Sequence, residues 1–415
     1  MTDIDRTRAE RLMQQAGIDA LLLFQPEAFH YAVGAPAGVA TMWGRAGPAI
    51  ALVPADRDSR IAAVASDHAA GQIRKAAPEV DLATHRIWID MVDLSALADR
   101  ADADPAAVDA AYRDQGRSGP RPETFDRSAC FSLLRDMLSV RGLSHGRIGV
   151  DLEFMPAADF AYLQSTLPEV RFADGSEILR RLRAVKSPRE IDCLRRAAMA
   201  AEGGLSRMAE TVARGVSLGD LSAAWKAGAQ ATAAAGGFAL SGHWDFISVG
   251  PDLSDMKAKV SPGALIKADV GTLVDGYSSD GARTFCFGPA APLAQRIFAS
   301  LENAFAAGLD LLKPGNSFGA VHAAMLASMR KDGFHEYFRG HFGHSVGGGV
   351  GIEEWPFFSA DSAELIEPGM VVALEAPFYA QGLGALMIED QFLVTPDGVE
   401  PMNSLPRGLR DLTVR

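Results

Sequence analysis

The chain has 415 residues, a formal net charge of −12 and a hydrophobic fraction of 48%. This length favours two domains, since a single hydrophobic core stops growing at about 250–300 residues. The negative charge disfavours nucleic acid or an anionic membrane as a partner. No uninterrupted apolar stretch reaches the roughly 18 residues that a membrane span needs, so no membrane segment is expected.

The N-terminus and the cysteines indicate a cytoplasmic protein. Residues 1–17 have the pattern of a charged amphipathic helix and not that of a signal peptide. The three cysteines, Cys130, Cys193 and Cys286, lack metal-ligand spacing and predict no disulfide framework. A reducing compartment follows from this pattern, and the cytoplasm is the simplest one.

The first half of the chain is expected to form an α/β domain that covers residues 1–175. Apolar runs typical of strands occur at residues 20–24, 49–53 and 148–150, and helical patterns lie between them. Residues 99–127 are rich in Ala, Asp, Pro and Gly, which predicts a surface excursion that contains one helix.

A helix start marks the entry to a second domain, expected at residues 176–415. Ser187, Pro188 and Glu190 have the spacing of a capping box, with Ser at the N-cap, Pro at N1 and Glu at N3. Further helices are predicted near residues 218–235, 292–312 and 317–331. They alternate with apolar runs that have the pattern of β-hairpins.

The second half of the chain contains five residues of types that bind metal ions. The segments that carry them are KADVGTLVDGYSSDGARTF, GHFGHSVGGG, VVALEAPF and ALMIEDQFLVT. Four carboxylates and one imidazole form a hard, oxygen-rich site suited to Mn(II), Fe(II), Co(II) or Zn(II). Crowded carboxylates repel one another, and two divalent ions would balance four of them. The five residues are Asp269, Asp280, His344, Glu375 and Glu389.

Two hairpins are expected to bring the carboxylates together. Asp275-Gly276 is a strong two-residue turn signal, and a turn there places Asp280 opposite Gly271, diagonal to Asp269. Both aspartates then share one face of the sheet, about 7 Å apart at the backbone. Glu375 and Glu389 lie on two apolar strands joined by a turn at residues 382–384. A pair of ions at such a site makes hydroxide from water at neutral pH, so the chain is interpreted as a metallohydrolase.

The order of these ligands resembles that of the creatinase/prolidase/methionine-aminopeptidase family. The matching motifs are DxG…GY..D..RTF, GHS.G, EPGM.V..E and IED..LVT. The resemblance implies a creatinase-like α/β N-terminal domain and an α+β catalytic domain with the "pita-bread" fold. It also implies that Asp269 binds one ion and that Asp280 and Glu389 bridge two. His344 and Glu375 would hold the second ion, and Glu375 would also pass protons to and from the metal-bound water.

The chain departs from the proline-directed peptidases of that family at two histidines. Residues 252–257, ahead of the first aspartate, contain no histidine where those peptidases carry one. After His344 the sequence is slightly longer than the family motif, so Glu353 or Gly351 falls where the second histidine belongs. Losing groups that stabilise a developing oxyanion often costs about 10²–10³ in rate. We therefore expect weak cleavage of ordinary Xaa-Pro dipeptides, and the chain is not a creatinase.

Other polar residues are candidates for binding the substrate. His341 lies three residues before His344, a spacing that puts it on the opposite strand face and favours a structural or ligand-supporting role over substrate contact. His243 is interpreted first as a surface or structural histidine and second as a residue of the pocket rim. Glu353 would favour a substrate with a cationic group.

One segment of the N-terminal half suggests a homodimer. Residues 42–45, Met-Trp-Gly-Arg, resemble the Phe-Gly-Arg segment that creatinase extends into its partner's active site. Arginine suits bidentate binding of a carboxylate, so Arg45, with Trp43 beside it, is a candidate for gripping a substrate carboxylate. The alternative is an ordinary loop arginine.

Three function classes remain open. The first is a dinuclear-metal hydrolase that cuts an amide or related C–N bond in a small molecule or dipeptide with a carboxylate, by means of a metal-bound hydroxide. Xaa-Pro peptides are its default substrates by family resemblance. The second is a non-peptide member of the family, similar to ectoine hydrolase or to dimethylsulfoniopropionate lyase. The third is a non-catalytic binding protein of this fold.

Overall fold

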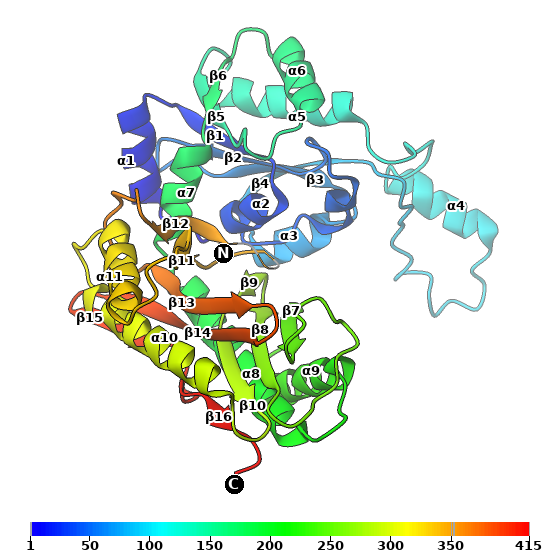
Figure 1. Ribbon diagram of the computed structural model, residues 1–415. Coiled ribbons are helices and arrows are strands. Elements are labelled where there is room, and N and C mark those ends of the chain that lie inside the picture. Colours follow the sequence, from blue (N-terminus) through cyan, green and yellow to red (C-terminus); the bar gives the residue numbers. More distant parts are fainter. Residues whose placement is uncertain (1, 350, 352, 415) are drawn as a thin grey trace. The chain divides into compact units, whose positions relative to one another are not determined.

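The computed structural model (Figure 1) describes residues 2–349, 351 and 353–414. The chain divides into two compact units, Met1–Leu182 and Arg183–Arg415. This division lies later than the boundary expected after residue 175, because Ile178, Leu179 and Leu182 of helix α7 (Ser176–Ala184) pack into the N-terminal core. In the described part of the chain, no helix is long and apolar enough to cross a membrane.

The N-terminal unit is built on a six-stranded mixed sheet in the order β4-β3-β2-β1-β5-β6. β1 and β3 each run antiparallel to β2, and the other neighbouring pairs are parallel. The strands are β1 (Ala20–Leu23), β2 (Ile50–Pro54), β3 (Ala62–Ser66), β4 (Asp81–His85), β5 (Arg147–Val150) and β6 (Arg171–Asp174).

Helices cover both faces of this sheet because both faces of its central strands are apolar. Leu21 and Leu23 belong to one core cluster and Leu22 to another, as the alternation of side chains along a strand requires. The expected α/β domain is confirmed. The helices are α1 (Arg6–Ala16), α2 (Pro26–Val33), α3 (Ala70–Ala76), α5 (Arg127–Val140) and α6 (Ala157–Thr166), with the 3₁₀ helix η1 (Gly38–Trp43) after α2.

The surface excursion predicted at residues 99–127 is also present. It contains the helix α4 (Pro105–Asp114), which buries none of its residues and stands away from the sheet in Figure 1. Asp104 caps this helix by accepting a hydrogen bond from the N–H of Ala107 at 2.9 Å.

The C-terminal unit is built on a ten-stranded sheet with the main order β12-β11-β13-β14-β10-β8-β7. Three short strands lie off this path, since β9 pairs with β8, β15 with β14 and β16 with β10. The strands are β7 (Gly242–Val249), β8 (Leu265–Val274), β9 (Tyr277–Ser278), β10 (Ala282–Cys286), β11 (His341–Ser345), β12 (Glu354–Ser359), β13 (Val371–Ala380), β14 (Gly384–Thr395), β15 (Gly398–Pro401) and β16 (Arg410–Asp411).

The predicted helices of this unit are confirmed, and their caps explain where they begin. Ser187 and Glu190 form the predicted capping box of α8 (Pro188–Thr211), and Ser217 caps α9 (Leu218–Ala235) in the same way. α10 (Pro292–Leu311) begins with proline, and Ser317 caps α11 (Phe318–Lys331).

One side-chain row of the sheet packs against these helices. Leu374 and Ala376 lie in a core cluster with residues of α10 and α11, and Ile266 and Ala268 lie in another with residues of α8 and α9. Because side chains alternate along a strand, the residue between Leu374 and Ala376 and the residue between Ile266 and Ala268 point to the opposite face of the sheet. That other face carries the predicted metal ligands.

Candidate metal centre

The predicted hairpin that carries the two aspartates is present with the expected register. Asp275 and Gly276 form its turn with positive φ angles of 48° and 82°, which a two-residue hairpin turn of this kind requires. Val274 pairs with Tyr277, and Ala282 pairs with Asp269 on the same register. Asp280 therefore lies diagonal to Asp269, as the sequence predicted.

The second hairpin places the two glutamates directly opposite each other. Glu375 on β13 pairs with Glu389 on β14, and Glu389 pairs with Ala282 on β10. Because Ala282 also pairs with Asp269, three carboxylates stand in one row across four neighbouring strands. The small side chain of Ala282 leaves room between them.

His344 reaches the same place from β11. Its Nε2 lies 3.5 Å from Oδ2 of Asp280. Its Nδ1 lies 2.9 Å from the carbonyl oxygen of Ser345, which can only accept a hydrogen bond. The proton is therefore on Nδ1, and the lone pair of Nε2 is directed at the carboxylates, as a metal ligand requires.

All five predicted ligands line one small cavity of about 70 Å³. Single ligand atoms of Asp280, His344 and Glu389 lie within 4.8 Å of one another, close enough to hold one ion together. Oδ1 of Asp280 and Oε2 of Glu389 are buried and have no hydrogen-bond partner in the described structure. Buried oxygens of this kind cost free energy unless a cation or donor faces them, so the residues fit a divalent metal.

Burial and mutual repulsion disfavour the charged forms of these two carboxyls. Burial raises the pKa of Asp280 well above its ordinary value, and the neighbouring Asp269 raises it further. Burial likewise raises the pKa of Glu389, with Asp280 as the next contributor. A metal ion reverses this balance because it favours the ionised form of each ligand.

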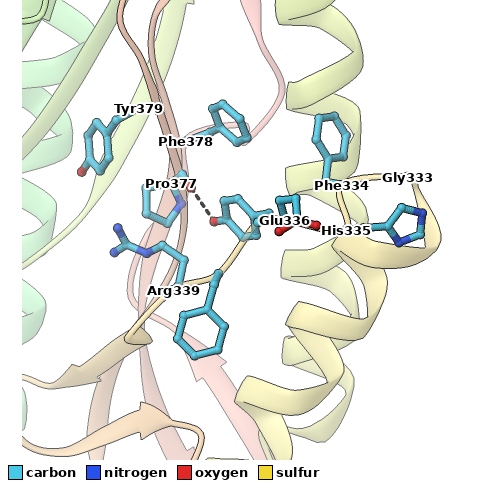
Figure 2. A pocket seen from close by; sticks show the side chains of 10 residues that line it. Gly333, Phe334, His335, Glu336, Arg339, Pro377, Phe378 and Tyr379 are labelled. Atoms are coloured by element: carbon cyan, nitrogen blue, oxygen red, sulfur yellow. Dashed lines mark hydrogen bonds between the residues drawn. The ribbon is translucent and has the colours of Figure 1, made fainter.

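The other two carboxylates each face a cation of the protein. Nζ of Lys267 lies 3.1 Å from Oδ2 of Asp269, and Nη2 of Arg339 lies 2.9 Å from Oε1 of Glu375. Figure 2 shows the guanidinium of Arg339 and the ring of Tyr379 on the same side of β13. The hydroxyl of Tyr337 donates a hydrogen bond to the carbonyl oxygen of Pro377 at 2.6 Å. Neither Lys267 nor Arg339 was identified from the sequence.

The strand-face argument for His341 is wrong. Its Nδ1 lies 3.2 Å from Oε1 of Glu375, and its ring centroid is 6.1 Å from that of His344. The register shifts between the two histidines, and Gly343 between them has a φ of 114°. This irregularity cancels the alternation of an ideal strand and turns both rings to one side. His341 contacts a predicted ligand, as the supporting role would require.

Glu353 borders the cavity, and its Oε2 lies 3.5 Å from Nε2 of His341. Its side chain is 53% exposed, so it faces solvent at the mouth of the cavity. The neighbouring Glu354 is buried and pairs with Arg183 and Lys186 instead. Gly351 lines the same cavity as Glu353, so both residues stay candidates for the place where the family resemblance implies a histidine.

His243 points away from the cavity. It lies on β7, packs edge-on against Trp225 with ring centroids 6.1 Å apart, and is exposed. The opposite face of the strand carries Trp244 and Phe246, which line the cavity. Phe246 pairs with Asp269 on β8. Strand alternation in residues 242–249 separates these residues from His243, but only the pairing with β8 shows which set faces the carboxylates.

Arg45 and Trp43 are held within the N-terminal unit. Arg45 forms a bidentate pair with Asp159, with Nε 2.9 Å from Oδ2 and Nη2 2.6 Å from Oδ1. Its side chain is nevertheless 46% exposed. Trp43 stacks on Phe125, with ring centroids 5.2 Å apart. Contact of either residue with a substrate stays a prediction.

Comparison with known proteins agrees with this arrangement. Residues 6–185 match the model of the Creatinase/Prolidase N-terminal domain, and residues 192–396 match that of metallopeptidase family M24. The putative dipeptidase YkvY of Bacillus subtilis is 26% identical over 68% of this chain and 78% of its own length. The Xaa-Pro dipeptidase of Lactobacillus helveticus is 26% identical over 69% of this chain and 78% of its own length.

Solved structures show the same fold. The Xaa-Pro dipeptidase from Bacillus anthracis superposes with a TM-score of 0.75 at 19% sequence identity, over 98% of each chain. The expected α/β N-terminal domain and pita-bread catalytic domain are thereby confirmed. The two family models together span nearly the whole chain, and this protein belongs to the creatinase/prolidase family, with a catalytic domain of metallopeptidase family M24.

Proposed function

We propose that this protein is a metal-dependent hydrolase that cleaves an amide or related C–N bond in a small molecule or dipeptide with a carboxylate. The observation that carries the proposal is the convergence of five ligand side chains on one cavity, with two buried oxygens that lack a partner. Bound divalent ions would supply a hydroxide nucleophile and a Lewis acid there. Two ions, chosen from Mn, Fe, Co or Zn, are the proposed cofactors.

The chain's own residues have separate tasks in this proposal. Asp269, Asp280, His344, Glu375 and Glu389 would hold the ions. Glu375 would also move protons, since Arg339 and His341 fix its Oε1 and leave the carboxylate in one orientation. Trp244 and Phe246 would exclude water from one wall of the cavity.

Substrate choice is proposed from the charge at the cavity mouth. A carboxylate at Glu353 cannot donate to a developing oxyanion, and it attracts a cationic group. We therefore place the preferred substrate among small zwitterions or peptides with a cationic group, in preference to neutral Xaa-Pro dipeptides. Hydrolysis of a non-peptide C–N bond, as in an ectoine-hydrolase-like enzyme, is the second candidate, and Glu353 favours it for the same reason. Proton abstraction, as in a dimethylsulfoniopropionate-lyase-like enzyme, would use the same carboxylates.

A substrate panel tests this proposal. Metal-free protein is reconstituted separately with Mn, Fe, Co and Zn, and assayed on Xaa-Pro dipeptides and on small zwitterions. We expect neutral Xaa-Pro dipeptides to be turned over with a kcat/KM below about 10⁴ M⁻¹s⁻¹, the lower end for competent enzymes. The variant Glu353→Gln keeps the shape and removes the charge, so it should reduce any preference for cationic substrates. Efficient cleavage of neutral dipeptides by the unaltered protein would contradict the proposed specificity.

A homodimer with shared active sites is proposed from residues 42–45. Arg45→Ala is expected to raise KM by a factor that corresponds to about 2–5 kcal/mol, since the substrate carboxylate loses its partner. The fold should persist, because Arg127 and the N–H of Ala46 also bond to Asp159, at 2.7 and 3.1 Å. Steady-state kinetics and calorimetry measure the two effects.

The other arginine on Asp159 is the matched control. Arg127→Ala removes a similar ion pair but should leave KM unchanged, so an equal rise in both variants would assign Arg45 a structural role only. Mixing Arg45→Ala subunits with subunits altered at Asp280 should restore one working site per heterodimer. A monomer with full activity would rule out the shared site.

The proposed location is the cytoplasm. Cys130, Cys193 and Cys286 are all buried and form no disulfide in the described structure, which suits a reducing compartment. Neither nucleic acid nor a membrane is proposed as a partner, given the net charge of −12.

A further inference from the structure

The four carboxylates of the metal centre differ in whether a lysine or arginine of the protein pairs with them. Asp269 faces Lys267, and Glu375 faces Arg339. Asp280 and Glu389 are not ion-paired with a lysine or arginine in the described structure, and each keeps one buried oxygen without a partner. Two of four negative charges are therefore already balanced by the protein, and a single divalent ion would balance the other two.

Lys267 is built into this centre. It lies on β8 two residues before Asp269, so both side chains point to the same face of the sheet. Lys267 is 5% exposed, and its Nζ lies 5.8 Å from the ring centroid of Tyr379. A buried ammonium needs a partner, and Asp269 supplies it at 3.1 Å. Removing Asp269 from this pair to serve a metal would leave the lysine uncompensated.

The unpaired carboxylates lie where one ion can reach three ligands. Asp280, His344 and Glu389 offer ligand atoms within 4.8 Å of one another. The free Nε2 of His344 lies on this side, because its Nδ1 is bound to the carbonyl of Ser345. Three ligands for one ion are therefore present without Asp269.

We infer that Lys267 weakens the metal position that needs Asp269, so that in this protein the difference between the two positions depends on this lysine. The position at Asp280, His344 and Glu389 binds its ion tightly. The position that needs Asp269 fills only when an ion displaces the Lys267 ammonium, which competes for the same carboxylate. The inference rests on the proposed function in taking this cavity as the metal site, and it assigns Lys267 as a positioning residue that sets metal stoichiometry.

The experiment is a metal titration of the full-length apoprotein. Mn(II) is added under anaerobic conditions, and bound metal is measured by equilibrium dialysis with elemental analysis. We expect the unaltered protein to bind one ion tightly and a second at least about tenfold more weakly. The variant Lys267→Met removes the charge and keeps the length, so the second ion should bind about 10- to 100-fold more tightly, the range in which groups that hold metal ligands usually act. Electron paramagnetic resonance at one equivalent should show an isolated ion in the unaltered protein and exchange-coupled pairs in the variant.

Three further variants make the result specific. Lys226→Met removes a lysine that pairs with Asp245 at 3.2 Å on β7, and it should bind metal as the unaltered protein does. Lys267→Arg keeps the charge and should keep the two affinities unequal. Lys267→Gln also removes the charge, so the second ion should bind more tightly as in Lys267→Met, and this variant keeps the inference testable if Lys267→Met does not fold.

The outcomes separate this inference from the proposed function. Two ions of equal affinity in the unaltered protein, or a second affinity that Lys267→Met leaves unchanged, would overturn the inference while hydrolysis could still be measured. A second ion that Lys267→Met binds more tightly, in a protein that hydrolyses no member of the substrate panel, would support the inference and contradict the proposed function.

Discussion

Replacing Asp280 by Asn, or Glu389 by Gln, is expected to abolish both metal uptake and turnover. Each variant removes a ligand that the family resemblance assigns to a bridge between two ions. Losing that charge at a metal site costs several kcal/mol of transition-state stabilisation, which is a rate loss of about 10³-fold or more. Bound metal is measured by elemental analysis after dialysis, and turnover on the best substrate of the panel.

Protein stability provides a second readout for these variants. Without metal, each buried carboxyl has a raised pKa, so a neutral amide of the same shape should leave the apoprotein at least as stable as before. With metal, the unaltered protein should gain about 2.7 kcal/mol at a hundredfold excess over Kd, and the variants should gain much less. Asp245→Asn is the matched control. Asp245 lies on β7 of the same sheet and accepts a hydrogen bond from Ser222 of α9, so its replacement should change neither metal content nor turnover. Full metal content with retained activity in either ligand variant would refute the metal centre.

Replacing Arg283 by Met is expected to have the largest effect on stability. Arg283 is 2% exposed and lies 2.6 Å from Oδ1 of Asp390 through its Nη2. Its guanidinium also donates to the carbonyl oxygens of Glu389, Leu405 and Pro406. Breaking a buried pair by removing one partner costs about 3–5 kcal/mol, and we expect a loss of that size in the free energy of unfolding.

Calorimetry of the apoprotein and the holoprotein measures this loss. The exposed Arg296 on α10 is the control, and Arg296→Met should change stability by no more than about 0.5 kcal/mol. Metal affinity should also fall in the Arg283 variant, because its Nη1 fixes the backbone of the predicted ligand Glu389 at 2.8 Å. If Arg283→Met lowered the free energy of unfolding by no more than Arg296→Met does, the structural role of Arg283 would be contradicted.

The sequence by itself determined the elements whose geometry is local. The Asp275-Gly276 turn sets the register of its hairpin through two positive φ angles, so the relation of Asp280 to Asp269 follows from the residues of that hairpin alone. The capping box at Ser187 located the start of α8 in the same way. The short turn at residues 382–384 predicted that Glu375 and Glu389 lie on two strands of one hairpin, and their direct pairing came from the structure.

The tertiary structure alone decided which elements meet and which faces they turn to one another. β10 lies between β8 and β14, and this order is what brings the aspartate hairpin beside the glutamate hairpin. The bulge near Gly343 turned His341 toward Glu375, against the alternation of an ideal strand. Phe246 reaches the site from β7, which precedes all five ligands in sequence, and Arg339, although it is close to His344 in sequence, contacts Glu375 on another strand. Periodicity fixes the relative directions of side chains within one element, whereas their contacts depend on long-range strand pairing, which no local pattern encodes.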